Sequence, residues 1–253
     1  MSTLEGSLSM LKQPAVIQYL LKGVAFTLVI SFFAVIIGIL LGSVLALCRN
    51  YCNKGFSRIF KWISIIYIEI FRNTPLLLWI FIALVFCKCP AFLHRKLFGL
   101  TAVEVQLLYK AVVALVLFTS SVIAEIVRGG LNSVPNGQFE AGHSQGFSTI
   151  QIMIYIILPQ AYRNVVPTLL SQVITTIKDS SYLANVAVIE LMARTKKLLS
   201  AEYNYNGTGQ VNVSDVFVLF GVTCLIYFII NFTLSCVVRS IRKKETKVTV
   251  ARS

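Results

Sequence analysis

Two long runs of the sequence contain no charged residue: residues 24–47, which are 24 positions long, and residues 216–238, which are 23 positions long. A helix of about 20 apolar residues crosses the ~30 Å hydrocarbon core of a bilayer, so each run can span a membrane. Of the 253 residues, 57% are hydrophobic and 13% are charged. Soluble domains carry roughly 25% charged residues. We therefore expect an all-α integral membrane protein.

The first of these runs contains two glycines four positions apart. Gly38 and Gly42 have the G-x-x-x-G spacing that lets two membrane helices approach closely. The same spacing also occurs by chance in long apolar runs. Two interpretations therefore stay open, a close helix–helix contact and a chance spacing.

A second span is expected to be broken in its middle. Residues 62–71 and 76–87 are apolar, and neither is long enough to cross a bilayer alone. They flank the polar sequence RNTP, in which Pro75 removes an amide donor and disfavours helix at Thr74. The two halves together predict one kinked span with charge near its middle.

Further apolar stretches complete a prediction of about five transmembrane helices. The fourth stretch is expected to be interrupted by the polar residues 159–164 and by Pro167. A short amphipathic helix is expected around residues 188–199, with Glu190 on a solvated or interface face. The predicted spans are residues 24–47, the broken pair 62–71 and 76–87, and residues 107–126, 152–177 and 216–238.

Basic residues gather on one side of these five spans. Four lie in the link after the first span and six in the tail after Val238. Cytoplasmic loops are enriched in lysine and arginine, so the C-terminus is expected in the cytoplasm and the N-terminus outside. The net charge of +13 then reflects orientation rather than nucleic-acid binding. We expect an extracytoplasmic segment 1–23 without a cleavable signal, a transmembrane domain 24–239 and a basic cytoplasmic tail 240–253.

The sequence GHSQG at 142–146 matches the G-x-S-x-G pattern of serine hydrolases. That pattern needs a strand before the serine and a histidine later in the chain. No strand pattern precedes Gly142, and no histidine follows Ser144, since His143 lies inside the motif and His94 upstream. A membrane-embedded hydrolase using Ser144 is therefore the weaker alternative. Cys87 and Cys89 lack a second ligand pair, so no metal site is expected.

The polar region 129–151 separates two apolar spans on the predicted cytoplasmic side. It can form a short helix lying across the span ends, with Ser133 as its cap and Pro135 just inside. Such a helix would offer a protrusion for a partner. An ordinary surface loop is the alternative from the residues alone.

Several longer motifs resemble one transporter family. They are EIFRNTPLLL (69–78), AEIVRGGLNSVPNGQFEAGHSQGFS (124–148), IILPQAYRNVVP (156–167) and KDSSYLANVAVIEL (178–191). The chain resembles the permease subunits of ATP-binding-cassette importers, in the polar amino-acid uptake family of histidine, arginine and glutamine permeases. The resemblance covers roughly residues 20 to 240. It implies the type I importer permease fold and a place in the bacterial inner membrane.

The resemblance also implies how such a subunit works. The chain would be non-catalytic and form the translocation path for a polar amino acid. A coupling helix at about 135–150 would dock on a dimer of a separate ATPase, which would hold ATP and Mg²⁺, so this chain needs no cofactor. A second permease copy or paralogue and an extracytoplasmic solute-binding protein would complete the importer. The matching coupling residues are Glu140, Ala141, Gly142 and Gly146.

Gly142 departs from the family pattern, which has a second alanine there. Glycine inside a helix costs up to about 1 kcal/mol relative to alanine, so Gly142 is expected to loosen the coupling helix.

Ionisable residues at membrane depth are costly and usually mark a site or an internal pair. A zwitterionic amino acid needs a cation for its carboxylate and an anion or carbonyls for its ammonium. We expect a substrate path lined by Glu69, Arg72, Asn73, Thr74, Lys178, Asp179, Ser180 and Ser181. The alternative is a structural network. In that network Arg72 pairs with Glu69, and Lys178 lies together with Asp179 at the interface. The sequence identifies neither the amino acid nor whether the pore is a homodimer.

Overall fold

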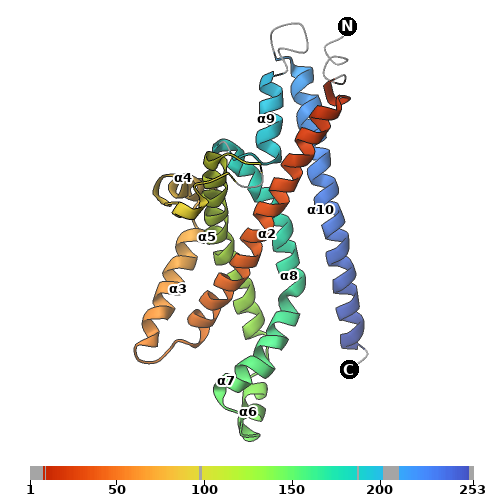
Figure 1. Ribbon diagram of the computed structural model, residues 1–253. Helices are drawn as coiled ribbons and strands as arrows, with labels where there is room; N and C mark the ends of the chain where they lie inside the picture. The colour runs from red at the N-terminus through yellow and green to blue at the C-terminus, as the bar shows by residue number, and fades with distance from the viewer. Residues whose placement is uncertain (1–7, 9, 97–98, 187, 202–210, 251–253) are drawn as a thin grey trace. The chain divides into compact units, whose positions relative to one another are not determined.

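The computed structural model describes residues 8, 10–96, 99–186, 188–201 and 211–250 (Figure 1). These residues form helices and connecting turns, with no strand among them. The first half contains α2 (Pro14–Tyr51), α3 (Ser57–Arg72), α4 (Leu76–Phe86), the 3-10 turn η1 (Ala91–Leu93) and α5 (Ala102–Asn132). The second half contains α6 (Gly137–Ser144), α7 (Thr149–Ile152), the π-helical turn η2 (Met153–Ile157), α8 (Leu158–Asp179), the 3-10 helix η3 (Ser180–Val186), α9 (Leu191–Ala201) and α10 (Val213–Val250).

The expected apolar spans correspond to long helices. Among the described residues, α2, α5 and α10 are each long and apolar enough to cross a membrane. The pair α3 and α4 forms a fourth candidate, broken at residues 73–75 with a bend of 112°. The predicted break at RNTP is confirmed, and the crossing of a bilayer by the two halves as one span stays a prediction. Helix α2 begins at Pro14, ten residues before the expected Val24, and Val16 and Leu20 in this extension are buried in an apolar cluster with Leu191.

The helix α8 differs from the expected fourth span. It is not among the helices that meet the length and hydropathy requirement, since polar residues occupy much of its first half. It is also not interrupted: α8 runs unbroken through residues 159–164 and through Pro167. Ala161, Val165 and Leu169 explain why, because they recur every fourth residue and are buried in one apolar cluster. Burial of this face outweighs the local polar and proline signals.

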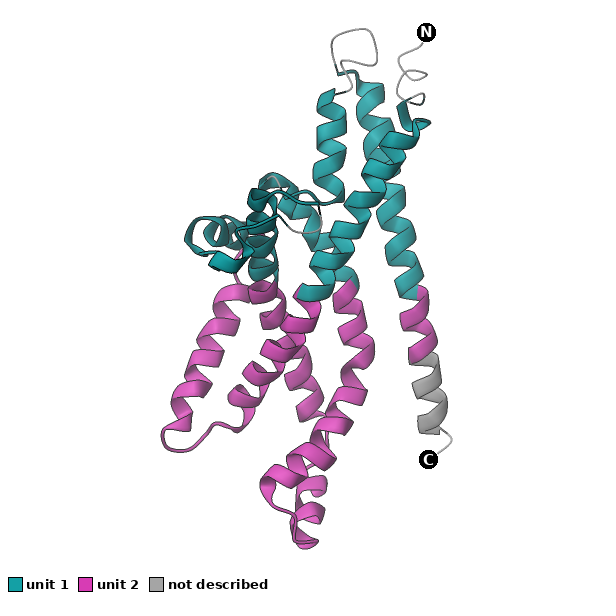
Figure 2. Cartoon of the chain, viewed as in Figure 1, with its two compact units in different colours: residues 1–33, 77–115, 174–235 teal, residues 34–76, 116–173, 236–253 magenta. Residues whose placement is uncertain are grey.

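The chain divides into two compact units, each made of three segments (Figure 2). Unit 1 comprises residues 1–33, 77–115 and 174–235, and unit 2 comprises residues 34–76, 116–173 and 236–253. One apolar cluster of unit 2 joins the C-terminal parts of α2 and α5 to α7, η2 and α8. In unit 1, one cluster joins the N-terminal part of α2 to the start of α9, and another joins Leu100 and Val105 to Ile189.

Within unit 2, α2 and α5 approach each other closely at Gly42. A Cβ atom at Gly42 would lie 2.7 Å from the Ser120 carbonyl oxygen and 2.9 Å from Ile123 Cγ2. A Cβ at Gly38 would meet nothing nearer than Thr119 Cγ2 at 3.4 Å. The spacing of the two glycines therefore does mark a helix–helix contact, and Gly42 is the residue that the contact requires.

This difference predicts opposite outcomes for two matched substitutions. Gly42→Ala is expected to lower the free energy of unfolding by about 1–3 kcal/mol, because the methyl group overlaps backbone that cannot move aside. Gly38→Ala fits in ordinary contact and is expected to be neutral or to gain up to about 1 kcal/mol of helix propensity. The apparent melting temperature of the purified chain in nanodiscs measures both. Equal shifts for the two variants would contradict the close contact at Gly42.

Candidate functional site

The polar region after α5 folds into a short helix, α6, that is followed directly by α7 (Figure 1). The expected cap is wrong. Asn136 precedes α6 and makes no side-chain capping bond. Ser133 instead belongs to the end of α5, where its Oγ donates to the Gly130 carbonyl and accepts from Asn164 Nδ2. Because α5 continues to Asn132, Ser133 satisfies the last turn of that helix and not the first turn of α6.

The expected coupling residues divide between the surface and the core of unit 2. Glu140 and Ala141 are exposed on α6, and Gly142 is buried against α7. A Cβ at Gly142 would lie 2.7 Å from Ile152 Cγ1 and 2.9 Å from Ile152 Cδ1. The glycine therefore permits α6 to pack on α7, and this packing accounts for its place where the family pattern has alanine.

Gly146 ends this helix in a left-handed conformation, with φ of +80°. The Phe147 N–H donates to the Gly142 carbonyl, and the Gly146 N–H donates to the His143 carbonyl. This is the Schellman arrangement, which glycine favours because it has no Cβ. Ser148 then begins α7 with a reciprocal capping box to Gln151. The sharp exit predicted for Gly146 is confirmed as geometry, and its docking role stays a prediction.

The surroundings of Ser144 do not support a hydrolase. Ser144 is the last residue of α6, and its Oγ donates to the Glu140 carbonyl at 2.9 Å. A nucleophile elbow requires a strand, a strained turn and an exposed hydroxyl. Here the serine lies in a helix and bonds within it. The G-x-S-x-G match is therefore a coincidence of sequence.

Two of the expected path residues belong to a charge cluster in unit 2 that the sequence did not reveal in full. Its centre is Glu125, whose side chain is 16% exposed. Arg49 Nη1 lies 2.5 Å from Glu125 Oε1, Arg128 Nη2 lies 2.7 Å from Oε2, and Arg72 Nη1 lies 3.7 Å from Oε2. Glu69 joins the cluster through Arg49 Nη2, at 3.5 Å. The alternative in which Arg72 pairs with Glu69 is wrong, since the acidic partner of Arg72 is Glu125.

Asn73 and Thr74 complete the end of α3 beside this cluster. Asn73 Nδ2 donates to the Glu69 carbonyl at 2.8 Å, and Thr74 Oγ1 donates to the Ile70 carbonyl at 2.6 Å. The last carbonyls of a helix have no partner within the helix, and Pro75 cannot supply an N–H. Both side chains therefore satisfy the broken end of α3 as the structure stands.

The second group of expected path residues lies in unit 1, where α8 passes into η3. Lys178 is exposed, Asp179 is half-buried and Ser180 is buried, with its Oγ donating to the Ile177 carbonyl. Ser181 follows and is half-buried. The two groups thus fall in different units of the chain. A shared path lined by both stays a prediction.

Glu190 is the residue whose role sequence reasoning missed most clearly. It is fully buried and not on a solvated face. Its carboxylate accepts from the Met192 N–H at 2.8 Å, the Ala193 N–H at 2.6 Å and the Tyr227 hydroxyl at 3.0 Å. Burial raises the pKa of the Glu190 carboxyl, and these hydrogen bonds act in the opposite direction. Its position just before the helical run that starts at Leu191 was the available signal, since acidic residues cap helices there.

A comparison with known protein families decides the class of this molecule. The model of the family described as "Binding-protein-dependent transport system inner membrane component" matches residues 34–247. The chain belongs to this family. It is a permease, the membrane component of a transport system that works with a separate binding protein.

Relatives of this permease carry names from amino-acid transport. The arginine transport system permease protein ArtQ of Bacillus subtilis is 31% identical over 228 residues, which cover 90% of this chain and 93% of ArtQ. The probable glutamine permease GlnM of the same organism is 33% identical over 229 residues, covering 90% and 93%. The L-cystine permease TcyB of Bacillus subtilis is 30% identical over 222 residues, covering 88% and 84%.

Solved structures agree on the fold of the permease. A crystal structure of an amino acid ABC transporter with histidines matches with a TM-score of 0.72 at 28% identity, covering 94% of this chain and 97% of that one. An inward-facing methionine transporter, MetNI, matches with a TM-score of 0.64 at 21% identity, covering 90% and 99%, and shows the fold alone. The permease therefore has the expected all-α fold of a type I importer.

Proposed function

We propose that this permease carries a polar amino acid into a bacterial cell across the inner membrane. The observation that carries the proposal is the exposed helix α6, which packs closely on α7 at Gly142 and ends at Gly146, with Glu140 on its surface. A short helix fixed in this way can transmit force from a partner to the helices behind it. The three relatives named above support a polar amino acid as the substrate class.

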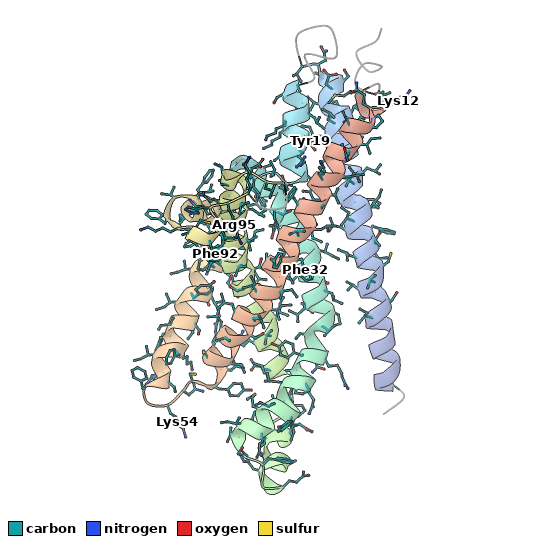
Figure 3. The ribbon with its side chains drawn as sticks, viewed as in Figure 1. Lys12, Tyr19, Phe32, Lys54, Phe92 and Arg95 are labelled. Atoms are coloured by element: carbon teal, nitrogen blue, oxygen red, sulfur yellow. The ribbon has the colours of Figure 1, made fainter. Side chains whose placement is uncertain are left out.

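The proposal includes the partners and the orientation. A dimer of separate ATPase subunits, which bind ATP and Mg²⁺, docks on α6 from the cytoplasm. A second copy of the permease or a paralogue completes the pore, and an external binding protein delivers the amino acid. Four basic residues between residues 49 and 61, on the same side as α6, support a cytoplasmic position for that side, and Lys54 lies in this link (Figure 3). The N-terminus is then outside.

In this proposal the ionisable residues of the two units serve the substrate. Arg72 is 44% exposed at its side chain and Glu69 is 50% exposed, so both retain surface for a ligand beyond their ion pairs. Lys178 and Asp179, followed by Ser180 and Ser181, offer both charge signs in unit 1. Asn73 and Thr74 act with Arg72 at the break, where freed backbone groups can meet a ligand.

Reversing the charge at Glu140 tests the docking. With Glu140→Arg we expect a loss of at least about tenfold in both co-purified ATPase and amino-acid uptake, since ~1.4 kcal/mol of lost docking energy has that effect. The tagged chain is expressed in its host. ATP hydrolysis is measured on the purified complex, and uptake of labelled arginine, glutamine and cystine is measured in cells.

Ser144→Ala is the matched control on the same helix. Among the described residues its hydroxyl bonds only to its own helix, so we expect docking and uptake to persist. If Ser144→Ala abolished ATPase docking and amino-acid uptake while Glu140→Arg preserved both, the result would favour the hydrolase alternative and contradict the proposed permease mechanism. Labelling of Glu140→Cys from the outside of intact cells would contradict the orientation.

A further inference from the structure

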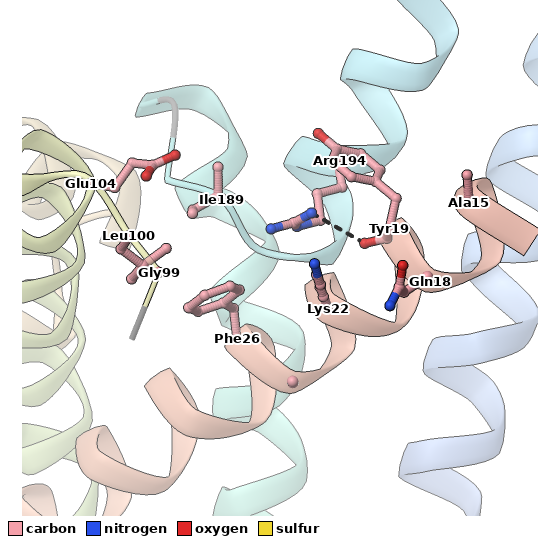
Figure 4. A pocket seen from close by; sticks show the side chains of 11 residues that line it. Ala15, Gln18, Tyr19, Lys22, Phe26, Gly99, Leu100, Glu104, Ile189 and Arg194 are labelled. Carbon is pink, nitrogen blue, oxygen red and sulfur yellow. Dashed lines mark hydrogen bonds between the residues drawn. The ribbon is translucent and has the colours of Figure 1, made fainter. Parts of the chain in front are cut away.

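Unit 1 contains a pocket of about 550 Å³ at the N-terminal part of α2 (Figure 4). Its walls come from one face of α2, from the turn that leads into α5, and from the start of α9. Small-molecule sites typically measure roughly 300–1,000 Å³ and combine apolar walls with a few polar groups. The residues that matter for its chemistry are Tyr19, Lys22, Phe26, Glu104 and Arg194. None of them belongs to the expected substrate path.

Arg194 is an unusual lining residue because it is 7% exposed and has no acidic partner among the described residues. Its Cζ lies 4.3 Å from the centre of the Tyr19 ring and 5.6 Å from that of Phe26. Nη1 donates to the Tyr19 carbonyl at 3.3 Å, Nη2 donates to none of the described residues, and Nε is enclosed without a hydrogen-bond partner in the described part of the chain. A buried cation with unused donors is costly unless an anion completes it.

The position of Arg194 is fixed by its neighbours. A Cβ at Gly23 would lie 2.8 Å from Arg194 Cδ and 2.9 Å from Leu191 Cα, so this glycine lets α2 and α9 meet at the arginine. Glu190 holds the first turn of α9 by accepting from the Met192 and Ala193 N–H groups. The guanidinium therefore lies at the pocket wall and is largely shielded from solvent.

Two further charges face the same pocket. Lys22 is exposed, and it makes no ion pair with any described residue. Figure 4 shows its amine directed to the same part of the pocket as the Arg194 guanidinium. Glu104 Oε2 accepts from the Thr101 N–H and hydroxyl, and Oε1 accepts from none of the described residues. Phe26, Leu100 and Ile189 supply apolar wall in the same pocket.

We propose that this pocket is a binding site for a free α-amino acid, separate from the expected path. Lys22 and Arg194 hold the carboxylate, Glu104 attracts the ammonium, and the side chain rests on the apolar wall. The inference rests on the function proposed above, which places this end of α2 outside the membrane. There the site would receive an amino acid before it enters the path.

Equilibrium binding to the purified full chain tests the site. The chain is placed in nanodiscs of zwitterionic lipid, without ATPase or binding protein, and titrated with labelled arginine, glutamine or cystine. For whichever of these amino acids binds the wild-type chain, Lys22→Gln is expected to weaken the binding by about tenfold, because the substitution removes a charged contact to the carboxylate. The carboxamide of the same amino acid is expected to bind wild-type chain about tenfold more weakly than the acid for the same reason.

Lys12→Gln is the matched control, because Lys12 is also an exposed lysine close to the N-terminus of α2 and lines none of this pocket (Figure 3). It is expected to leave binding unchanged. Arg194→Lys keeps the charge and loses the planar fork, and we expect binding weaker than wild type with the same melting temperature to within a few degrees.

Three results would overturn the site. They are equal affinities for Lys22→Gln and Lys12→Gln, equal affinities for the acid and its carboxamide, and no binding of any of the three amino acids. Retention of phosphatidylglycerol that depends on Lys22, seen by native mass spectrometry in place of amino-acid binding, would assign the same cations to a lipid headgroup and also overturn it. Failure of the proposed function would give a different result. The wild-type chain would neither dock an ATPase nor support uptake, but in nanodiscs it would still bind the amino acid.

Discussion

Replacing Glu125 by glutamine is expected to lower the free energy of unfolding by about 3 kcal/mol, one of the two largest effects of a single substitution that we predict. Glu125 Oε1 and Oε2 together meet three arginines, Arg49, Arg72 and Arg128. Without this carboxylate the three guanidinium groups repel one another, and among the described residues only Glu69 remains to offset them. The value lies at the low end of the usual cost of breaking a buried ion pair, because the arginine side chains are 21%, 44% and 34% exposed.

Glu69→Gln is the matched control in the same cluster. The Glu69 side chain is 50% exposed and meets Arg49 at 3.5 Å, so its loss is expected to cost less than about 1 kcal/mol. Chemical denaturation of both variants in the same detergent measures the difference. Equal destabilisation by Glu125→Gln and Glu69→Gln would show that the cluster has no centre at Glu125.

The second large effect is expected at Glu190. Its carboxylate satisfies two backbone N–H groups at the start of α9 and the hydroxyl of Tyr227 on α10. In Glu190→Gln the amide nitrogen must replace one accepting oxygen, so a buried donor faces another donor. Leaving such a buried group unsatisfied costs about 1–3 kcal/mol, and the lost cap adds about 0.5–2 kcal/mol. At about 2–4 °C per kcal/mol, the melting temperature should fall by roughly 3–20 °C.

Glu104→Gln provides the comparison for Glu190. Glu104 also serves the first turn of a helix, through Thr101, at a half-buried position open to solvent. Its loss is expected to shift the melting temperature by about 2–4 °C, since water can replace the lost hydrogen bonds. If Glu190→Gln melted no lower than Glu104→Gln, the buried network around Glu190 would contribute nothing beyond an ordinary cap.

The long apolar runs predicted most of the fold, and local signals failed where packing opposed them. The uncharged runs 24–47 and 216–238 lie inside α2 and α10, and Pro75 marks the break between α3 and α4. The interruption expected in α8 does not occur, because Val165 and Leu169 gain more from burial than Pro167 costs. Helix propensity depends on a residue and its near neighbours in the sequence, whereas the burial of a side chain depends on segments that are far away in the chain.

The same limit applies to the charged residues. Glu69 and Arg72 stood out in the sequence as ionisable groups in an apolar setting. The partner of Glu69 is Arg49 on α2, 20 residues away, and that of Arg72 is Glu125 on α5, 53 residues away. No spacing rule reveals such a pair. Gly142 was expected to loosen its helix, and only the contact with Ile152 shows why a side chain is excluded there. Single-sequence reasoning therefore found which residues are special and missed what they touch.

The π-helical turn at Met153–Ile157 has a consequence for recognition of the tip formed by α6 and α7. Such a turn holds one residue more than the α-helical turn that it replaces, and each residue turns a helix by about 100°. The number of residues in this turn therefore sets the azimuth at which Glu140 faces outward around the axis of α8. The groove of a partner must match that angle as well as the charge of Glu140. Insertion or deletion of one residue in this π-helical turn would therefore change the direction in which α6 faces without altering any contact residue.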